Sequence, residues 1–229
     1  MTWTGKIIGD DSAWGDGPGA DMALVVGDPA APGEPLPGKL IPEAPTEGPG
    51  GIYLPDLGTL RSVDRLALIG FQALNPHWDG IAVVLGDRAS LWITLSAGEA
   101  IHLQGSATPA LIAALGLSDQ GVSGLDAAMD SPDRLPMLLH DAPDDATRTG
   151  TLIGAEIGAA RTLWLGQQAV LRCEWHLCFA HGGLQIFDKR VHVALGHPHL
   201  RMSGSHIAAG VVAPCAQQIA ELLPQRTLE

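Results

Sequence analysis

The chain has 229 residues, of which 46% are hydrophobic, and a formal net charge of -12. This length fits one large domain or two small lobes, and the hydrophobic content excludes an intrinsically disordered chain. With 25 Asp and Glu residues against 13 Lys and Arg residues, the surface is expected to repel phosphate backbones and anionic lipids. We therefore expect neither nucleic acid nor a membrane as a partner.

The sequence predicts neither a membrane span nor a disulfide framework. The longest apolar run near the end, Ile207–Ala216, is shorter than the ~18 residues that a membrane-crossing helix needs. Met1–Asp11 contains no basic region followed by an apolar stretch, so no signal peptide is expected. The three cysteines lack regular spacing, which disfavours paired disulfides. A cytoplasmic location is the expectation that follows.

The first part of the chain combines two short apolar segments with a region rich in glycine and proline. Lys6–Ile8 and Met22–Val26 predict a pair of short strands. Between Gly27 and Gly58, 15 of 32 residues are Gly or Pro, which excludes a helix and disfavours a central strand. We expect a long extended connection on the surface here, or equally a hinge or a lid.

Alternating apolar residues then predict three strands followed by a helix. The strands of this meander are expected over Ile81–Leu85, Leu91–Leu95 and Ala100–Leu103. The helix is expected over Ala110–Leu115, with Thr108 as its N-cap and Pro109 at its first position. Three strands and a helix in this order are typical of one half of an actin-like or ribonuclease-H-like module.

A second helix is predicted from about Arg148 to Leu165. Glycines at positions 150, 154 and 158 form a stripe along it, which lets another backbone approach closely. The charged residues Arg148, Glu156 and Arg161 favour a helix that packs on a sheet rather than one that dimerises in a membrane.

The last part of the chain predicts further strands and a helix. Alternation continues through Leu171–Phe179 and then through Val191 and Val193. A helix of small residues is expected over Ile207–Leu223, kinked at Pro214.

One segment resembles a phosphate-binding loop without meeting its physical requirements. Gly33–Leu40 matches the first seven positions of such a loop, but two prolines remove backbone donors that would face the phosphate. Leu40 stands where Ser or Thr would hold Mg²⁺, and Ile41 and Pro42 prevent the helix that should follow. We interpret the match as a coincidence of composition.

Four metal-capable side chains lie within nine residues, namely Cys173, His176, Cys178 and His181. On one continuous strand Cys173 and Cys178 would face opposite ways, so the four side chains would not converge on one ion. Core cysteines with edge histidines are therefore the favoured interpretation, with a metal site as the alternative, and no metal ligand is predicted.

Four segments carry a resemblance to a known family of enzymes. In chain order they are Ile7–Trp14, Arg61–Leu66, Val84–Trp92 and Gly150–Ile157. The last reads GTLIGAEI and resembles the Gly-Leu-Leu-Ile-Gly-x-Glu helix of the 2-dehydro-3-deoxygalactonokinases, which are bacterial kinases of sugar acids. The other three fall in the family's order and resemble its Met-x-Gly-Ser-x-x-Gly-Trp loop, its Arg-Gly-Glu-Glu-Thr-Gln segment and its Pro-Gly-Thr-His-x-Lys-Trp hairpin.

The resemblance implies a fold of the α/β class, the actin-like/hexokinase (ribonuclease-H-like) ATPase fold, with a mixed sheet and flanking helices. Nothing before Ile7 resembles the family's first phosphate-binding turn, so the N-terminal lobe is expected to be truncated, or its first strand to be encoded upstream of Met1. Residues 1–60 would be a remnant of that lobe with the Gly/Pro-rich connection. Residues 61–229 would be a ribonuclease-H-like α/β domain.

The resemblance also implies a cleft for a sugar acid. Gly9, Trp14 and Arg61 would line this cleft, with Arg61 pairing the ligand's carboxylate through two hydrogen bonds. Arg88 in the hairpin is the fourth predicted substrate-binding residue. A small sugar acid is thus the expected partner, and a homo-oligomer is left open.

Several residues that the family uses for phosphate are replaced in this chain. In the hairpin, Asp87 and Arg88 stand in place of Thr-His, so a turn that would bind an anion carries a carboxylate. Thr108–Ala110 lacks the carboxylate of the family's Thr-Gly-Glu, and Gly86 is the remaining candidate for cofactor binding. The catalytic residue stays unknown, with Asp87 and Asp64 as the only candidates for a base or a metal ligand.

Two functions follow from these observations. In the first, the protein is a kinase that uses ATP and Mg²⁺ to phosphorylate a hydroxyl of a 2-keto-3-deoxy sugar acid. In the second, it is a catalytically inactive relative that needs no cofactor and serves as a sugar-acid-binding, regulatory or assembly protein. Phosphoryl transfer depends on positioning and electrostatics, so the missing phosphate-binding residues favour the second.

Overall fold

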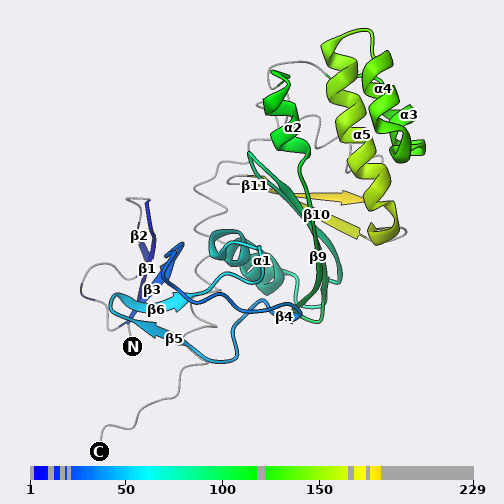
Figure 1. Ribbon diagram of the computed structural model, residues 1–229. Helices are drawn as coiled ribbons and strands as arrows, with labels where there is room; N and C mark the ends of the chain where they lie inside the picture. Colours follow the sequence, from blue (N-terminus) through cyan, green and yellow to red (C-terminus); the bar gives the residue numbers. More distant parts are fainter. Residues whose placement is uncertain are drawn as a thin grey trace, which may run out of the picture. The chain divides into compact units, whose positions relative to one another are not determined.

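A computed structural model of the chain describes residues 3–9, 13–15, 19, 22–117, 122–164, 168–173 and 176–181 (Figure 1). It divides into two compact units. Over the described residues, unit 1 consists of residues up to Trp78 together with Leu95–His102, and unit 2 of Asp79–Thr94 together with residues from Leu103 onward. The domain boundary predicted between residues 60 and 61 stays a prediction, and the elements expected over 191–193 and 207–223 lie outside the described residues.

Unit 1 contains a five-stranded sheet in the order β2-β1-β3-β6-β5. Its strands are β1 (Trp3–Ile7), β2 (Ala13–Gly15), β3 (Met22–Val26), β5 (Thr46–Gly48) and β6 (Gly51–Leu54). The three central strands β1, β3 and β6 are parallel, and the edge strands β2 and β5 run antiparallel to their neighbours. The predicted strand pair at the N-terminus is confirmed as the adjacent strands β1 and β3.

The Gly/Pro-rich segment is more ordered than its composition predicts. It contains no helix, as expected, but the prediction of a surface connection is wrong for β6, which lies between β3 and β5 inside the sheet. Leu40, Leu54 and Leu57 of this segment are at most 2% exposed. The physical reason is that prolines flank β6 without entering it, so its backbone N–H groups remain able to pair with β3. A two-residue strand β4 (Gly38–Lys39) pairs antiparallel with β9.

Helix α1 (Ser62–Leu74) follows this segment and was not predicted. Leu66, Leu68, Ile69 and Phe71 are all buried on it, which gives an apolar pattern that covers most of its circumference. A fully buried Arg65 interrupts that pattern in the sequence. The helix ends at Leu74, before a Pro at position 76 that could not continue it.

Unit 2 is built on a meander with a parallel addition (Figure 1). The sheet runs β11-β10-β7-β8-β9, with β7 (Gly80–Leu85), β8 (Ser90–Ser96), β9 (Glu99–Ser106), β10 (Gln168–Cys173) and β11 (His176–His181). The three predicted strands of the meander are confirmed as β7, β8 and β9. Strand β10 is parallel to β7 and antiparallel to β11, so the single strand predicted over 171–179 is wrong. Two strands form there instead, and they place Cys173 opposite His176.

Five helical segments belong to unit 2, among its described residues. They are α2 (Thr108–Ala114), α3 (Leu125–Asp130), the 3₁₀ turn η1 (Pro132–Arg134), α4 (Leu135–Asp141) and α5 (Asp145–Trp164). The predicted N-cap of α2 is wrong, because Ala107 occupies that position and the Thr108 hydroxyl is hydrogen-bonded to Ser106 at 2.9 Å. The helices α3 and α4 were not predicted.

Helix α5 confirms the long predicted helix and packs through two surfaces. Its Ile153 and Ile157 join a buried cluster with Ile81 and Trp92 of the sheet, as expected for a helix that lies on a sheet. The glycine stripe contacts a different neighbour: a Cβ atom at position 150, 154 or 158 would clash with backbone oxygens at 123, 125 or 129, in α3 and the segment before it. The stripe thus serves close helix packing.

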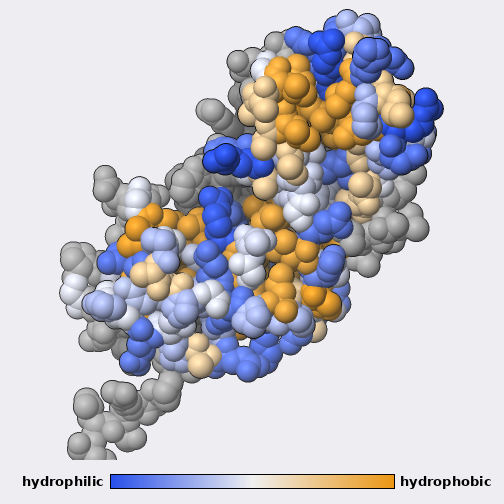
Figure 2. Space-filling model, viewed as in Figure 1, coloured by the Kyte–Doolittle hydropathy of each residue, from blue (hydrophilic) through white to orange (hydrophobic). Residues whose placement is uncertain are grey.

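Unit 2 also presents apolar side chains to solvent. Leu111 on α2, Leu115 at the C-cap of α2 and Met137 on α4 are 44–58% exposed. Figure 2 shows apolar residues gathered over the helices of this unit, next to hydrophilic ones. Over the described part of the chain, no helix has the length and apolar character that a bilayer crossing requires. The structure is thus a mixed α/β protein with parallel and antiparallel strands and flanking helices.

Candidate functional site

The three parallel strands of unit 1 end at one edge of their sheet. Ligands of open α/β sheets bind outside the carboxyl ends of such strands. After β1 the chain turns at Gly9, after β3 at Gly27, and after β6 it continues into Asp56. The Ile8 N–H donates to the Val26 carbonyl at 2.8 Å, so the ends of β1 and β3 lie together.

The first turn of α1 is hydrogen-bonded to this edge. The Gly27 N–H donates to the Ser62 hydroxyl at 2.9 Å, and the Ser62 N–H donates to a carboxylate oxygen of Asp56 at 2.6 Å. Gly27 has φ +82°, a backbone conformation that L side chains rarely adopt. The start of α1 is therefore fixed between the ends of β3 and β6.

Arg61 stands directly before α1 at this edge. Its Nη2 lies 2.9 Å and its Nε 3.1 Å from the same oxygen of Asp64, whose side chain is only 6% exposed. The Arg61 side chain is 70% exposed, so the guanidinium is oriented by a buried carboxylate and still open to solvent. A guanidinium in this state can pair the carboxylate of a ligand through two parallel hydrogen bonds.

The structure brings together some of the residues expected at a sugar-acid cleft. Gly9 and Arg61 both lie at the carboxyl edge. Trp14 lies elsewhere on the sheet, because its strand β2 pairs it with Gly5 in the middle of β1. Asp64, a candidate base, is the ion-pair partner of Arg61. The binding and catalytic roles of these residues stay predictions.

Three further predicted residues occupy the turn between β7 and β8 in unit 2. The Gly86 N–H donates to the Ala89 carbonyl at 3.0 Å, which closes the turn, and Asp87 and Arg88 are exposed at its tip. The Gly86 N–H is therefore already used within the turn. An exposed carboxylate beside it disfavours phosphate at this position.

The glutamate of the GTLIGAEI segment has a clear structural role. Glu156 is 7% exposed, and its Oε1 accepts hydrogen bonds from the Ser90 hydroxyl at 2.6 Å and from the Trp92 indole N–H at 2.9 Å. These bonds connect α5 to β8. The segment that carries the resemblance most specifically thus supports the packing of unit 2.

The described residues contain no group of three or more His, Cys, Asp or Glu side chains that could hold a metal ion. Cys173 and His176 are cross-strand neighbours at the ends of β10 and β11. Other predicted members of this cluster, Cys178 and His181, pair along β11 with Leu171 and Gln168.

Sequence reasoning missed the residues that shape the carboxyl edge, chiefly Ser62, Asp56 and Gly27. One signal could have found them: Asp28 and Asp56 each follow an apolar run closely, which is where polar residues at the end of a buried strand are expected. The glycine and proline content around the run before Asp56 predicts a connection rather than a strand, so the sequence pattern marks no strand end there.

Comparison with known proteins gives a fold and no family. No protein-family model and no curated protein matches the sequence. Among solved structures, the chain is similar to a protein from Sinorhizobium meliloti described as a putative 2-dehydro-3-deoxygalactonokinase. The two share 16% identity with a TM-score of 0.62, over 86% of this chain and 80% of the other. The similarity shows a shared fold.

Proposed function

We propose that this protein binds a small sugar acid at the carboxyl edge of β1, β3 and β6, with Arg61 pairing the ligand's carboxylate. The observation that carries the proposal is the state of Arg61, which is 70% exposed and yet held by the buried Asp64 at the start of α1. A cation placed before a helix N-terminus adds to the positive potential of the helix dipole, so the two together favour an anion.

The chemistry around Arg61 suits a polyhydroxy acid. Asp56 is exposed and keeps a second carboxylate oxygen besides the one that binds Ser62, so it can accept a hydrogen bond from a ligand hydroxyl. Gly9 leaves space for close approach to the backbone, because no atom lies within 4 Å of where its Cβ would stand. The name of the similar structure and the resemblance of the sequence both suggest a 2-dehydro-3-deoxy sugar acid as the ligand.

We further propose that binding is not followed by phosphoryl transfer. Transfer relies on cations and backbone donors around the phosphates. In the hairpin that resembles the family's anion-binding turn, the Gly86 N–H is used internally and Asp87 adds negative charge. The resulting function is that of a sugar-acid-binding protein with a regulatory or assembly role.

Isothermal titration calorimetry with 2-dehydro-3-deoxygalactonate, and separately with MgATP, tests this proposal. We expect the acid to bind and MgATP not to bind. Arg61→Gln should weaken acid binding by about tenfold or more, because the charge-assisted pair is lost. Arg148→Gln, a matched change at an ion-paired and partly exposed arginine of α5, should leave it unchanged. Equal affinities of the wild type and Arg61→Gln would refute the role of Arg61.

Kinase activity on the same acid is the second candidate function, and the fold similarity to a protein described as a kinase favours it. It would require ATP and Mg²⁺, with Asp64 or Asp87 as the candidate base. An ADP-release assay with both substrates distinguishes the two: turnover above background that disappears in Arg61→Gln would establish the kinase. Acid binding without turnover would leave the binding protein as the function.

A further inference from the structure

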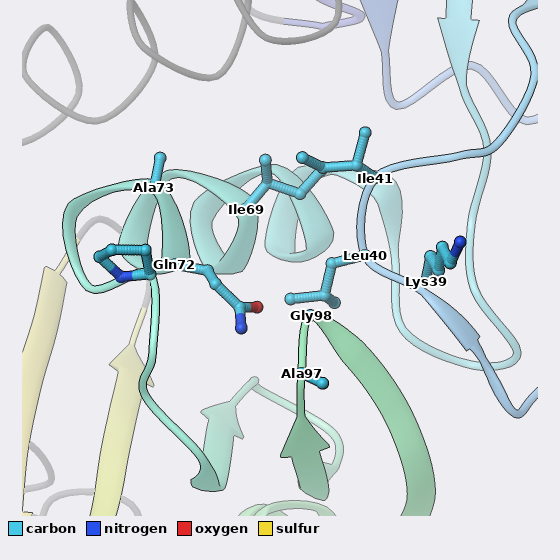
Figure 3. A pocket seen from close by; sticks show the side chains of 9 residues that line it. Lys39, Leu40, Ile41, Ile69, Gln72, Ala73, Ala97 and Gly98 are labelled. Atoms are coloured by element: carbon cyan, nitrogen blue, oxygen red, sulfur yellow. The ribbon is translucent and has the colours of Figure 1, made fainter. Parts of the chain in front are cut away.

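Unit 1 contains a cavity of about 300 Å³ beside the C-terminal half of α1 (Figure 3). The segment 39–41, residues Ile69, Gln72 and Ala73 of α1, and the turn at Ala97 and Gly98 line it. A volume of this size is at the lower end of the range for small-molecule sites.

The walls of the cavity are mainly apolar, and one buried polar group in them has no partner. Leu40, Ile41, Ile69 and Ala73 supply aliphatic surface. The Oε1 atom of Gln72 is shielded from solvent and accepts no hydrogen bond from any described residue. Figure 3 shows the amide of Gln72 extending from α1 toward Leu40 and Gly98. Buried polar groups are nearly always satisfied, so an orphaned acceptor at a cavity wall indicates a missing donor.

The cationic residue of the lining does not make the cavity an anion site. Lys39 Nζ lies 2.7 Å from Glu43, and Figure 3 shows the amine pointing away from the Gln72 amide. The carboxylate of Glu99 also lies near enough to raise the pKa of Lys39, after the larger effect of its hydrogen bond to Glu43. The amine of Lys39 is thus directed toward Glu43 and away from the Gln72 side of the cavity.

We propose that this cavity binds a small neutral, largely apolar molecule with one N–H or O–H group. That group would donate a hydrogen bond to Oε1 of Gln72. The apolar walls select the body of the ligand, the lysine amine points away from the Gln72 amide and so gives no preference for an acid there, and the orphaned oxygen selects a donor. The terminal torsion of a glutamine side chain is broad, so a small rotation turns Oε1 into the cavity. This ligand differs in charge from the sugar acid proposed for the carboxyl edge. The experiments below therefore test this cavity independently of the sugar-acid site.

Three probes titrated into the full-length protein test this inference by calorimetry and by ¹H–¹⁵N NMR: indole, 1-methylindole and indole-3-carboxylate. Indole keeps the donor, 1-methylindole removes it at nearly constant shape, and indole-3-carboxylate adds a negative charge. We expect indole to bind about three- to tenfold more tightly than 1-methylindole, which corresponds to one net hydrogen bond, and more tightly than indole-3-carboxylate. The side-chain amide resonances of Gln72 should shift with indole.

Variants then locate the site. Gln72→Leu should bring the affinity ratio of indole to 1-methylindole to about one, whereas Gln104→Leu on β9, outside the cavity, should leave the ratio unchanged. Ala73→Phe should abolish binding of both by filling the cavity. The inference is overturned if wild-type protein binds none of the probes, if it does not discriminate indole from 1-methylindole, or if the carboxylate binds best. These wild-type results decide the question even where Gln72→Leu fails to fold.

Discussion

The two units each bury a charged side chain, Arg65 in unit 1 and Glu156 in unit 2, and satisfy it in opposite ways. Glu156 on α5 accepts from side chains of β8, a strand whose backbone is already paired within its sheet. Arg65 on α1 donates mostly to main-chain oxygens of the Gly/Pro-rich segment. Its partners, at 2.7–2.8 Å, are the carbonyls of Leu40, Pro55 and Lys39 and a carboxylate oxygen of Glu34.

The difference shows how a chain poor in backbone donors becomes ordered. Each of the eight prolines between Gly27 and Gly58 lacks an N–H, so carbonyls in that segment outnumber the donors available locally. Arg65 supplies four of its N–H groups to this region from a single, rigid guanidinium. Burial lowers the pKa of Arg65, which Glu34 partly opposes, and an arginine remains charged in proteins nonetheless. In unit 2 the backbone groups of the sheet are satisfied mostly by pairing between strands, and Glu156 adds hydrogen bonds that connect α5 to β8.

Replacing Arg65 should have the largest effect. Arg65→Met keeps much of the volume but leaves three carbonyls and Glu34 without their donor, so we expect a loss of about 3–5 kcal/mol in the free energy of unfolding. Urea denaturation followed by circular dichroism measures it. Arg65→Lys should recover little, because an ammonium group cannot reach four acceptors in a fork arrangement. A loss below about 1 kcal/mol in Arg65→Met would show that the segment orders without this residue.

Replacing Glu156 should have a smaller effect. Glu156→Leu leaves the Ser90 hydroxyl and the Trp92 indole N–H without an acceptor, at a cost of about 1–3 kcal/mol. Glu156→Gln retains a carbonyl oxygen for both donors and should cost less than Glu156→Leu. The same denaturation experiment compares all variants, and the contrast between the units fails if Glu156→Leu destabilises more than Arg65→Met.

The smallest expected effect is at the start of α5, and it depends on pH. Asp144 accepts the Thr147 N–H at 2.7 Å, and this bond lowers the carboxyl pKa from its ordinary value of 3.8. A lowered pKa in the folded state gives stability that is present above pH 3.8 and is lost as the pH falls through the folded value. Asp144→Ala should therefore lower Tm by about 2–4 °C at pH 7, with the difference shrinking below about pH 4.

Thermal melts of the wild type and Asp144→Ala at pH 7, 4 and 3 make this measurement. Asp133→Ala serves as the control, because Asp133 is an exposed residue of the η1 turn. A difference in Tm that stays constant from pH 7 to pH 3 would contradict a contribution from the ionised carboxylate.

Local patterns predicted much of unit 2 and little of unit 1. The meander and α5 were found because their apolar residues alternate or recur within a few positions. Strand β6 was missed because its stability comes from pairing with β3, 28 residues earlier in the chain, and from side chains such as Leu54 that composition does not distinguish. Helix α1 was missed because Arg65 stands where the pattern requires an apolar residue.

The candidate site was predictable in the same uneven way. Arg61 and Gly9 were proposed through the resemblance and lie at one edge of the sheet. Asp56 and Ser62 were not, because their position depends on where β6 ends. The phosphate-loop match at Gly33–Leu40 is followed by strands rather than by the helix that such a loop requires, and its last two carbonyls are bonded to Arg65.

The strand β4 has a consequence for how the chain is made. Its two residues pair with Glu99 and Ala100, and Leu95–His102 belongs to unit 1 although the rest of that hairpin belongs to unit 2. When the first 78 residues have been synthesised, β9, the strand that pairs with Lys39, has not yet been made. Unit 1 cannot be completed before position 102 emerges, by which time β7, all of β8 and the first half of β9 have also been synthesised. Unit 1 therefore completes its fold only while unit 2 is already being synthesised, and a gene fragment that ends at residue 78 encodes neither unit in full.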